Sequence, residues 1–265
     1  MYVLELPQKS DSIQSMLFWE HELRRFRTAL QERFEVEITD DLIRKAICVM
    51  NRERRLRRQL AKVMELDDPP ITGRQLLDLR SSISGISCDL KQYQHVLDWV
   101  RIQPGGGYAD RTRVLLTGVP LAQGAERVLE IIEGNGGLVV CMENCSGLKP
   151  ILEDVDEKAD DPIVALAVKY FQVPCAVMTR NDRRLDTIRS MVRQYRPHCI
   201  IDLVWQACLT YDVESVRVRH MAEQELGLPY LRIETDYSPN DSARIATRVQ
   251  ALFETVGGKA VGKPG

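Results

Sequence analysis

The stretch RVLLTGVPLAQGAERVLEIIEGNGGLVVCMENC, residues 113–145, decides the fold. It opens with the apolar run RVLLTG (113–118), passes through AQGAERVLEIIEGNG (122–136), which has helical spacing, and returns to an apolar run, GLVVCME (137–143). Short runs rich in Val, Ile and Leu on either side of an amphipathic helix are typical of parallel strands joined by a crossover. The stretch therefore predicts a βαβ unit in a parallel sheet that is covered on both faces.

The same alternation continues along the chain. We expect helices over 161–172, 181–195, 211–227 and 240–256, and strands over 199–205 and 229–235. This order predicts a doubly wound parallel α/β domain, Rossmann-like, over residues 106–258. The Gly- and Lys-rich end of the chain, 259–265, is expected to be a disordered tail.

A helical region precedes this domain. Residues 12–35 and about 39–66 show the three- and four-residue spacing of long amphipathic helices, with Thr39 or Asp40 as the cap of the second. Shorter helices are expected near 73–84 and 89–101. The segment QPGGGYADRT (103–112) is predicted to be a flexible joint, so we place the boundary at residue 105.

The charge balance argues against a dedicated nucleic-acid binder. Lys and Arg number 36 and Asp and Glu 38, for a formal charge of −2. The Arg-rich segment NRERRLRRQLAK (51–62) is best interpreted as a solvated helix face. Its charge would be offset by acids nearby in the sequence, which are Glu20, Glu22, Glu32, Glu35 and Glu37.

No apolar run approaches the ~18–20 residues of a membrane span, and the N-terminus has no signal-peptide pattern. We therefore expect no membrane association and a cytoplasmic protein. Seven cysteines in a reducing compartment are a poor disulfide framework.

Three of these cysteines follow expected strands. Cys145, Cys175 and Cys208 each lie in a loop after an apolar run, 30 and 33 residues apart. Because such loops meet at the carboxyl edge of a parallel sheet, the three thiols could converge there. Iron–sulfur cubanes are held by cysteine thiolates, usually four, so three would leave one iron to another ligand.

Other interpretations of the cysteines stay open at this point. A single cysteine is most often a small buried apolar group, which is what we expect of Cys48 and Cys199, while Cys88 and Cys141 are ambiguous. A zinc site formed by Cys141, Cys145, Cys175 and Cys208 is the competing metal site. The turn at Gly118, which leads into a helix, could hold a phosphate or could simply be a tight turn.

Longer motifs then make the sequence recognisable. GVPLAQGAERVLEIIEGNGGLVV, MENCSGLKP, VPCAVMTRNDRRLDTI, IIDLVWQACLTYDVES and ELGLPYLRIETDYSPNDSARIATRVQALFE occur in this order. Together they resemble the 2-hydroxyacyl-CoA dehydratase / benzoyl-CoA reductase family, which includes the 2-hydroxyglutaryl-CoA dehydratase D-component type. Within it, WQACLTYDVES followed by TDYS is most similar to the double-cubane cluster proteins. The resemblance covers 113–256 and extends more weakly to the start of the chain.

The resemblance implies an iron–sulfur component of a low-potential reduction system that receives electrons from a separate iron–sulfur ATPase. In the double-cubane branch, Cys145, Cys175 and Cys208 match cluster ligands; in the acyl-CoA branch only the position of Cys208 is shared. The cofactor would be a [4Fe–4S] cluster or half of a double cubane. The reaction would be the reduction of a small molecule or, as an alternative, the dehydration of an acyl-CoA thioester by a lyase.

One departure from the family pattern affects these expectations. Family members begin with an additional α/β domain that holds further cysteine ligands, and MYVLELPQ (1–8) is interpreted as the last strand of such a domain. The chain would then be a subunit that pairs with a second copy or a full-length homologue through helices 12–66, or a truncated, non-catalytic partner. Glu143 and Asp236 are candidate proton donors near a cluster, although Asp236 could instead cap a helix or turn.

Overall fold

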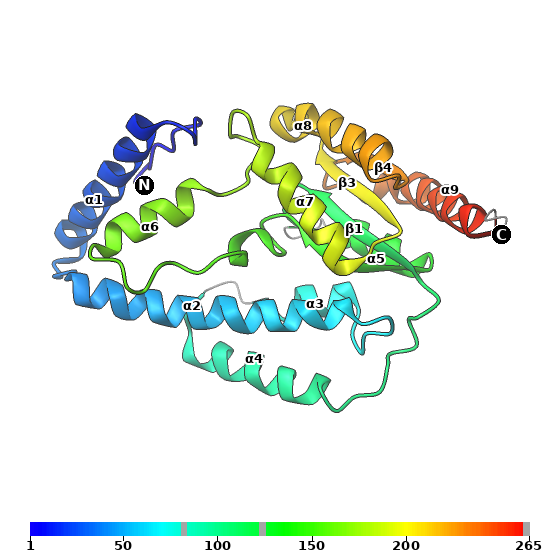
Figure 1. Cartoon of the computed structure of the whole chain (residues 1–265), viewed down its shortest axis with the longest axis horizontal. Helices are drawn as coiled ribbons and strands as arrows, with labels where there is room; N and C mark the ends of the chain where they lie inside the picture. The colour runs from blue at the N-terminus through cyan, green and yellow to red at the C-terminus, as the bar shows by residue number, and fades with distance from the viewer. Residues whose placement is uncertain (81–83, 122–125, 262–265) are drawn as a thin grey trace.

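The computed structural model describes residues 1–80, 84–121 and 126–261, with side chains to residue 257 (Figure 1). Its helices are α1 (Ile13–Phe34), α2 (Asp40–Lys62), α3 (Gly73–Asp78), α4 (Ser87–Val100), α5 (Glu126–Gly134), α6 (Pro162–Phe171), α7 (Asp182–Tyr195), α8 (Leu209–His220) and α9 (Ser242–Val261). The strands are β1 (Thr112–Gly118), β2 (Gly137–Glu143), β3 (Cys199–Trp205) and β4 (Tyr230–Thr235). No helix in these described ranges is long and apolar enough to cross a bilayer.

The four strands form one parallel sheet in the order β2-β1-β3-β4. β1 is central, and the chain moves outward from it in both directions, which is the doubly wound arrangement expected from the sequence. The α/β fold class is thereby confirmed, and the strand bounds 137–143 and 199–205 coincide with the predicted ones. Apolar runs identify these strands because both of their faces are buried.

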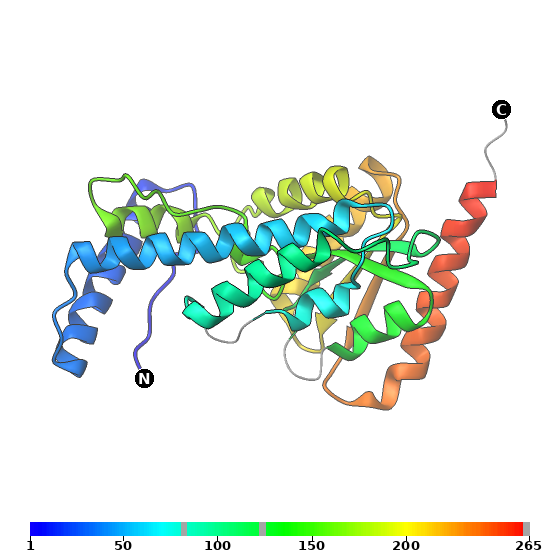
Figure 2. The same ribbon diagram turned by 90° about the horizontal axis from the view of Figure 1, so that it is seen from below.

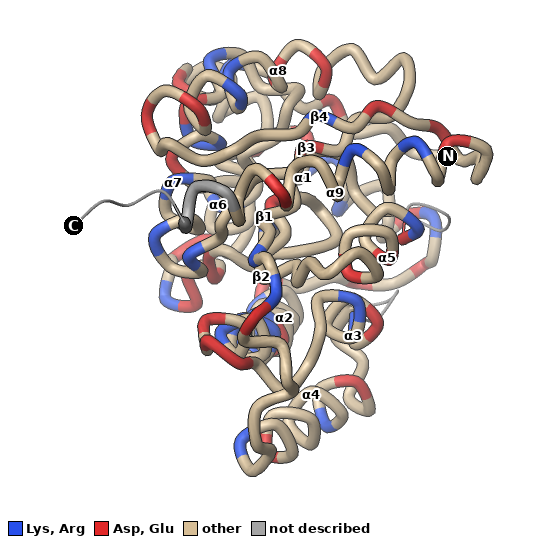
Figure 3. The backbone as a smooth tube through the Cα atoms, turned by 90° about the vertical axis from the view of Figure 1, so that its right-hand side faces the viewer, with Lys and Arg blue, Asp and Glu red and all other residues tan. Residues whose placement is uncertain are grey.

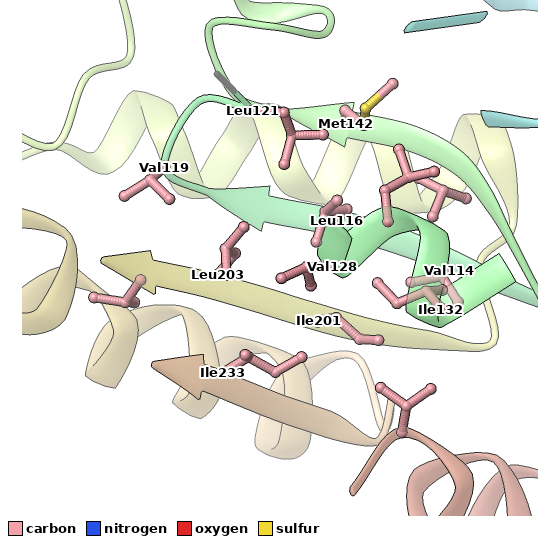
Figure 4. Close-up of a cluster of buried hydrophobic side chains, with 14 of the residues drawn as sticks. Val114, Leu116, Val119, Leu121, Val128, Ile132, Met142, Ile201, Leu203 and Ile233 are labelled. Atoms are coloured by element: carbon pink, nitrogen blue, oxygen red, sulfur yellow. The ribbon is translucent and has the colours of Figure 1, made fainter. Parts of the chain in front are cut away.

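Helices cover the two faces of the sheet. On one face, α5 and α9 pack against side chains such as Val114, Leu116 and Ile201 (Figure 4). On the other, α2, α7 and α8 pack against Leu115, Leu138 and Ile200. That second cluster also contains Ala61 and Val100 from the helical region, so the helical region contributes side chains to the core on this face of the sheet.

The helical region extends away from the sheet along α2 (Figures 1 and 2). α1 packs on α6 through Trp19 and Phe171, and α2 packs on α4 through Leu56, Leu60 and Tyr93. The predicted cap of α2 is confirmed, because Thr39 Oγ1 accepts a hydrogen bond from the backbone N–H of Leu42 at 3.3 Å. The acids Asp40 and Asp41 follow in the first turn, where the helix dipole favours negative charge.

The Asp68 carboxylate holds the glycine-rich segment 103–112 in place. Asp68 accepts hydrogen bonds from the backbone N–H groups of Gly107 and Tyr108 at 3.2 and 2.6 Å.

The opening residues 1–8 do not form the strand that the sequence suggested. They run along α1, where the Tyr2 and Phe26 rings lie 5.3 Å apart and Glu22 accepts from the N–H of Glu5.

Several element ends differ from the predictions. α3 ends at Asp78 rather than near residue 84, and α9 continues to Val261 rather than ending at residue 256. The helix expected over 211–227 is α-helical to His220 and continues as a π-helical turn over Met221–Glu225. No strand lies between α6 and α7 in the described residues, so Cys175 does not follow a strand as we expected. Cys175 instead sits in a turn-rich segment, because Val173 and Met178 close hydrogen-bonded turns around it.

Basic and acidic residues are mixed along the backbone (Figure 3), and arginines of α2 form ion pairs with acids. The partners differ from those expected: Arg55 and Arg58 bind Asp154 and Glu157 of the segment before α6, not the glutamates of α1. Arg54 is buried and donates to Asn51 and to Tyr170. These arginines therefore attach α2 to the second half of the chain.

Candidate functional site

Three polar side chains form a row across the carboxyl edge of the sheet. Thr117 on β1 pairs in register with Glu143 on β2 and with Asp202 on β3. All three residues have no exposed surface. Laterally paired residues share one face of a sheet, and this face is covered by α7 and α8. The row therefore places two carboxylates and a hydroxyl beneath the helices that cover the edge.

Glu143 is held between two buried cations. Its Oε2 accepts from Arg184 Nε at 3.2 Å and from Thr117 Oγ1 at 2.5 Å. Its Oε1 faces Lys149 Nζ at 2.9 Å as an ion-pair contact. Arg184 also donates to Thr117 at 3.0 Å, so the strand pair and α7 are joined by one network. The Glu143 carboxylate therefore connects β1, α7 and the segment after β2.

The start of α8 closes the network. Lys149 Nζ donates to the Tyr211 hydroxyl at 3.3 Å, and the Arg184 guanidinium lies 5.1 Å from the centre of the Tyr211 ring. Burial opposes the charge on Lys149, but Glu143 outweighs it and raises the pKa of that ammonium. Burial also raises the pKa of Tyr211 to about 12, so its hydroxyl stays protonated. Lys149 and Arg184 therefore both carry a positive charge, and they lie on either side of the Glu143 carboxylate.

Asp202 differs from Glu143, although both belong to the same row. Burial raises its pKa to about 6, against the opposing charge of Arg184. Oδ2 accepts from the Tyr230 hydroxyl at 3.0 Å, but Oδ1 is buried without a hydrogen-bond partner among the described residues. Oδ1 lies against Gly118, where an added Cβ would come within 2.8 Å of it. Asp202 can therefore change its charge near neutral pH.

Cys145 and Cys175 lie near one another at this edge. Cys145 is two residues beyond the end of β2 and, like Cys175, is half-buried. Burial raises the pKa of the Cys145 thiol; the charge of Lys149 opposes this rise, and Cys175 adds to it. The two thiols lie close enough to interact, and a bound metal ion would displace their protons, so they could serve as two ligands of a thiolate metal site.

Cys208 is the N-cap residue of α8 and follows the end of β3. Its sulfur lies 3.8 Å from Thr210 Oγ1, and its side chain packs partly against the core under α5 and α9. Tyr211, one turn further along α8, lies close enough to Cys145 for the two groups to affect each other's charge. Ala207, just before Cys208, has a left-handed backbone with φ of 65°. Within the described chain, no three His, Cys, Asp or Glu side chains surround a single-ion site.

The remaining cysteines divide by burial. Cys199 is fully buried, as expected, whereas the prediction that Cys48 is core was wrong, since it is exposed beside Glu157. Cys88 is exposed, and Cys141 is buried inside β2, where burial raises the pKa of its thiol strongly. Because Cys141 packs in the core beneath α7 and α8, its sulfur is poorly placed to share a zinc ion with the loop cysteines, which weakens the four-cysteine zinc interpretation.

Asp236, the second acid proposed from the sequence, is exposed and makes a turn. Its carboxylate accepts from the backbone N–H of Ser238 at 2.7 Å.

Sequence reasoning missed Lys149, Arg184 and Asp202. Only Asp202 carried a signal, as a charge inside the apolar run CIIDLVW. The possible phosphate site after Gly118 includes residues 122–125, which lie outside the described residues.

An open parallel sheet with thiols and a buried ion cluster at its carboxyl edge defines an α/β protein with a site at the ends of its strands. The model of the family "2-hydroxyglutaryl-CoA dehydratase, D-component" matches residues 1–256. A relative from Escherichia coli (strain K12), named "Putative dehydratase subunit YjiM", is 34% identical over 267 residues, which cover 96% of this chain and 67% of the relative. The chain belongs to the 2-hydroxyglutaryl-CoA dehydratase D-component family, whose members bind iron–sulfur clusters and work with an activator.

Proposed function

We propose that this chain is the iron–sulfur component of an ATP-dependent dehydratase or reductase of the 2-hydroxyacyl-CoA dehydratase type. The observation that supports this most is the pair of half-buried thiols, Cys145 and Cys175, beside a buried ammonium at the carboxyl edge of the sheet. Cys208, on the same edge, would be the third ligand. A bound cluster would supply one-electron reduction at low potential, and the partner iron–sulfur ATPase would supply the electron.

The buried ion cluster suggests how the protein would support that group. Lys149 lies near Cys145, where its charge opposes the rise in the pKa of that thiol which burial causes, and Glu143 fixes the position of Lys149. The positive charges of Lys149 and Arg184 would also lower the cost of adding an electron to a cluster held there. In this proposal Glu143 is a positioning residue, because its carboxylate contacts Lys149 and Arg184 and is fully buried between them.

The test is anaerobic reconstitution with iron and sulfide. C208S should remove most of the bound iron, because the position of Cys208 is shared by both branches of the family. C145S and C175S should remove iron only if the chain follows the double-cubane branch. C48S is the matched control, since Cys48 is exposed and remote in sequence from the edge. Stoichiometric zinc with no iron in the wild-type protein would contradict the redox function.

The double-cubane reductase remains a second candidate function, because three cysteines rather than one are present at the matching positions. It predicts reduction of a small molecule instead of dehydration of an acyl-CoA thioester. If neither metal binds to the chain alone, a full-length homologue is added in trans. Recovery of a cluster in that mixture would support the iron–sulfur function, and failure would leave a non-catalytic subunit as the remaining candidate.

We also propose that the chain associates with a second copy or a homologous subunit. α1 and the segment before it expose apolar side chains that a monomer would leave in water, namely Val3, Ile13, Leu17 and Phe18. Light scattering should show a species larger than the monomer, and L17E should reduce it. A stable monomer that captures no homologous subunit would contradict this. The cytoplasmic location stays a prediction.

A further inference from the structure

Lys169 on α6 is a buried amine with few hydrogen-bond partners. The residue is only 8% exposed, and Nζ donates one long hydrogen bond, to the carbonyl oxygen of Pro150 at 3.5 Å. Among the described residues, no carboxylate lies within ion-pair distance of Nζ, which lies 5.1 Å from the centre of the Tyr170 ring. An ammonium carries three N–H donors, so a charged Lys169 would leave donors unsatisfied in a buried place.

Two arginines of α2 lie beside this amine. Arg54 is buried, and its Nη2 donates to the hydroxyl of Tyr170 at 2.8 Å, on the same side chain that Lys169 contacts. Arg58 Nη1 donates to the carbonyl oxygen of Ile151 at 2.7 Å, next to the carbonyl that Lys169 uses. The three cations therefore meet where α2 and α6 pack against the segment 150–154.

A third arginine and two acids complete the cluster. Arg183 at the start of α7 pairs with Glu153 at 2.5 Å, and Arg58 pairs with Asp154 at 2.7 Å. The cluster consists of Arg54, Arg58, Lys169 and Arg183 with Glu153 and Asp154, next to the balanced pair Arg55 and Glu157. Four cations therefore face two carboxylates, and this excess of positive charge disfavours a charged amine in their midst.

The cluster favours the neutral form of the amine. Burial and then the charge of Arg54 lower the pKa of Lys169 to about 8, although Glu153 opposes this change. At about pH 7.5, roughly a quarter of such an amine is neutral, against about 0.1% of a lysine with the ordinary pKa of 10.5. Because the neutral amine has a free electron pair, Lys169 presents more than about a hundred times as much nucleophile as a surface lysine.

We infer that Lys169 is a carbon dioxide site, at which its amine forms a carbamate held between the arginines of α2 and α7. In this step the nitrogen electron pair attacks the carbon of CO₂ and forms an N–C bond. One C=O π pair moves onto oxygen, and the proton leaves the nitrogen for water, so no oxidant or reductant is needed.

The carbamate would balance the charge of the cluster. Residue 169 changes from a charge of +1 to −1, so that three cations then face three anions. Guanidinium groups match the planar geometry of such an anion and bind it through charge-assisted hydrogen bonds. The inference does not depend on the proposed function, since no thiol or cluster takes part.

The experiment equilibrates the full metal-free chain with isotope-labelled carbon dioxide and bicarbonate and observes it by carbon NMR. We expect a carbamate resonance that K169R lacks, because a guanidinium does not form a carbamate. K158R is the matched control and should keep the resonance, since Lys158 is exposed on the segment before α6. The N-terminal amine also forms a carbamate, but that signal is common to all three proteins.

Trapping identifies the modified residue without any variant, so the test stands even if K169R does not fold. Triethyloxonium converts a carbamate into a stable ethyl carbamate, which peptide mass spectrometry then locates. In the wild-type protein the adduct on Lys169 should exceed that on Lys158 at least about tenfold. Three results would overturn the inference: no resonance that depends on Lys169, equal adducts on the two lysines, or bound bicarbonate without a trapped adduct. Each is independent of whether iron can be loaded.

Discussion

Arg184 on α7 and Glu143 at the end of β2 form an ion pair in which neither side chain has any exposed surface, with Nε 3.2 Å from Oε2. The pair joins a helix to the carboxyl edge of the sheet directly below the loop that carries Cys145. Buried pairs of this kind contribute little net stability by comparison with apolar packing, but removal of one partner leaves an uncompensated charge. This asymmetry leads to the first prediction.

R184M should destabilise the protein by about 3–5 kcal/mol, since Glu143 would keep only Lys149 as a buried counter-charge. The measurement is urea unfolding followed by circular dichroism. R101M serves as the control, because Arg101 and Asp98 are both well exposed and their pair should contribute less than about 1 kcal/mol. Equal stabilities for the two variants would show that the buried pair is not required for folding.

Asp202 should make stability fall as the pH rises. Its pKa is about 6 in the folded chain against 3.8 in the unfolded chain, so the folded state holds the proton more tightly between about pH 4 and pH 6. The contribution of Asp202 to the free energy of unfolding is therefore fully present below about pH 4 and is lost as the pH rises through 6. The loss amounts to about 2–3 kcal/mol.

The comparison with D202N isolates this effect, because other titrating groups are common to both proteins. The free energy of unfolding of D202N relative to wild type should rise by about 2–3 kcal/mol from pH 4 to pH 8. A difference that does not change with pH would mean that Asp202 stays ionised in the folded state.

Gly118 should tolerate no side chain. Its φ is 105°, and a Cβ there would lie 2.0 Å from the carbonyl oxygen of Leu203. G118A should therefore cost more than about 2 kcal/mol, measured by thermal or urea unfolding. Gly134 at the end of α5 is the control, since its Cβ would meet nothing within 4 Å and G134A should not destabilise the protein. A mild effect of G118A would contradict the close approach of β1 and β3.

Ala207 precedes Cys208 with a left-handed backbone, φ 65°, which disfavours any residue with a Cβ by about 1–2 kcal/mol. A207G should therefore leave stability unchanged or raise it by up to about 1 kcal/mol. A251G, at an exposed position inside α9, should destabilise the protein by about 1 kcal/mol, as glycine normally does in a helix. Losses of the same size in both variants would contradict the strained conformation at Ala207.

The site was only partly predictable. The rule that loops after strands lie at the carboxyl edge of a parallel sheet predicted the positions of Cys145 and Cys208, which follow β2 and β3; their role as ligands stays a prediction. For Cys175 the predicted strand was wrong, since no strand lies between α6 and α7 in the described residues, and turns there bring it near Cys145. The exposure of Cys48 was missed because helical spacing alone does not show which face of α2 is covered.

The sequence by itself determined the parallel sheet, its strand bounds and the long helices, because apolar periodicity and caps act over a few neighbouring residues. It also carried the family relationship in its ordered motifs. Only the tertiary structure decided the partners of charged groups. Glu143, Lys149 and Arg184 are spread over 42 residues of sequence, and Asp68 holds a glycine joint nearly 40 residues away. Pairing of this kind depends on which elements pack together, since the energy of a buried charge is set by neighbours in space rather than in sequence.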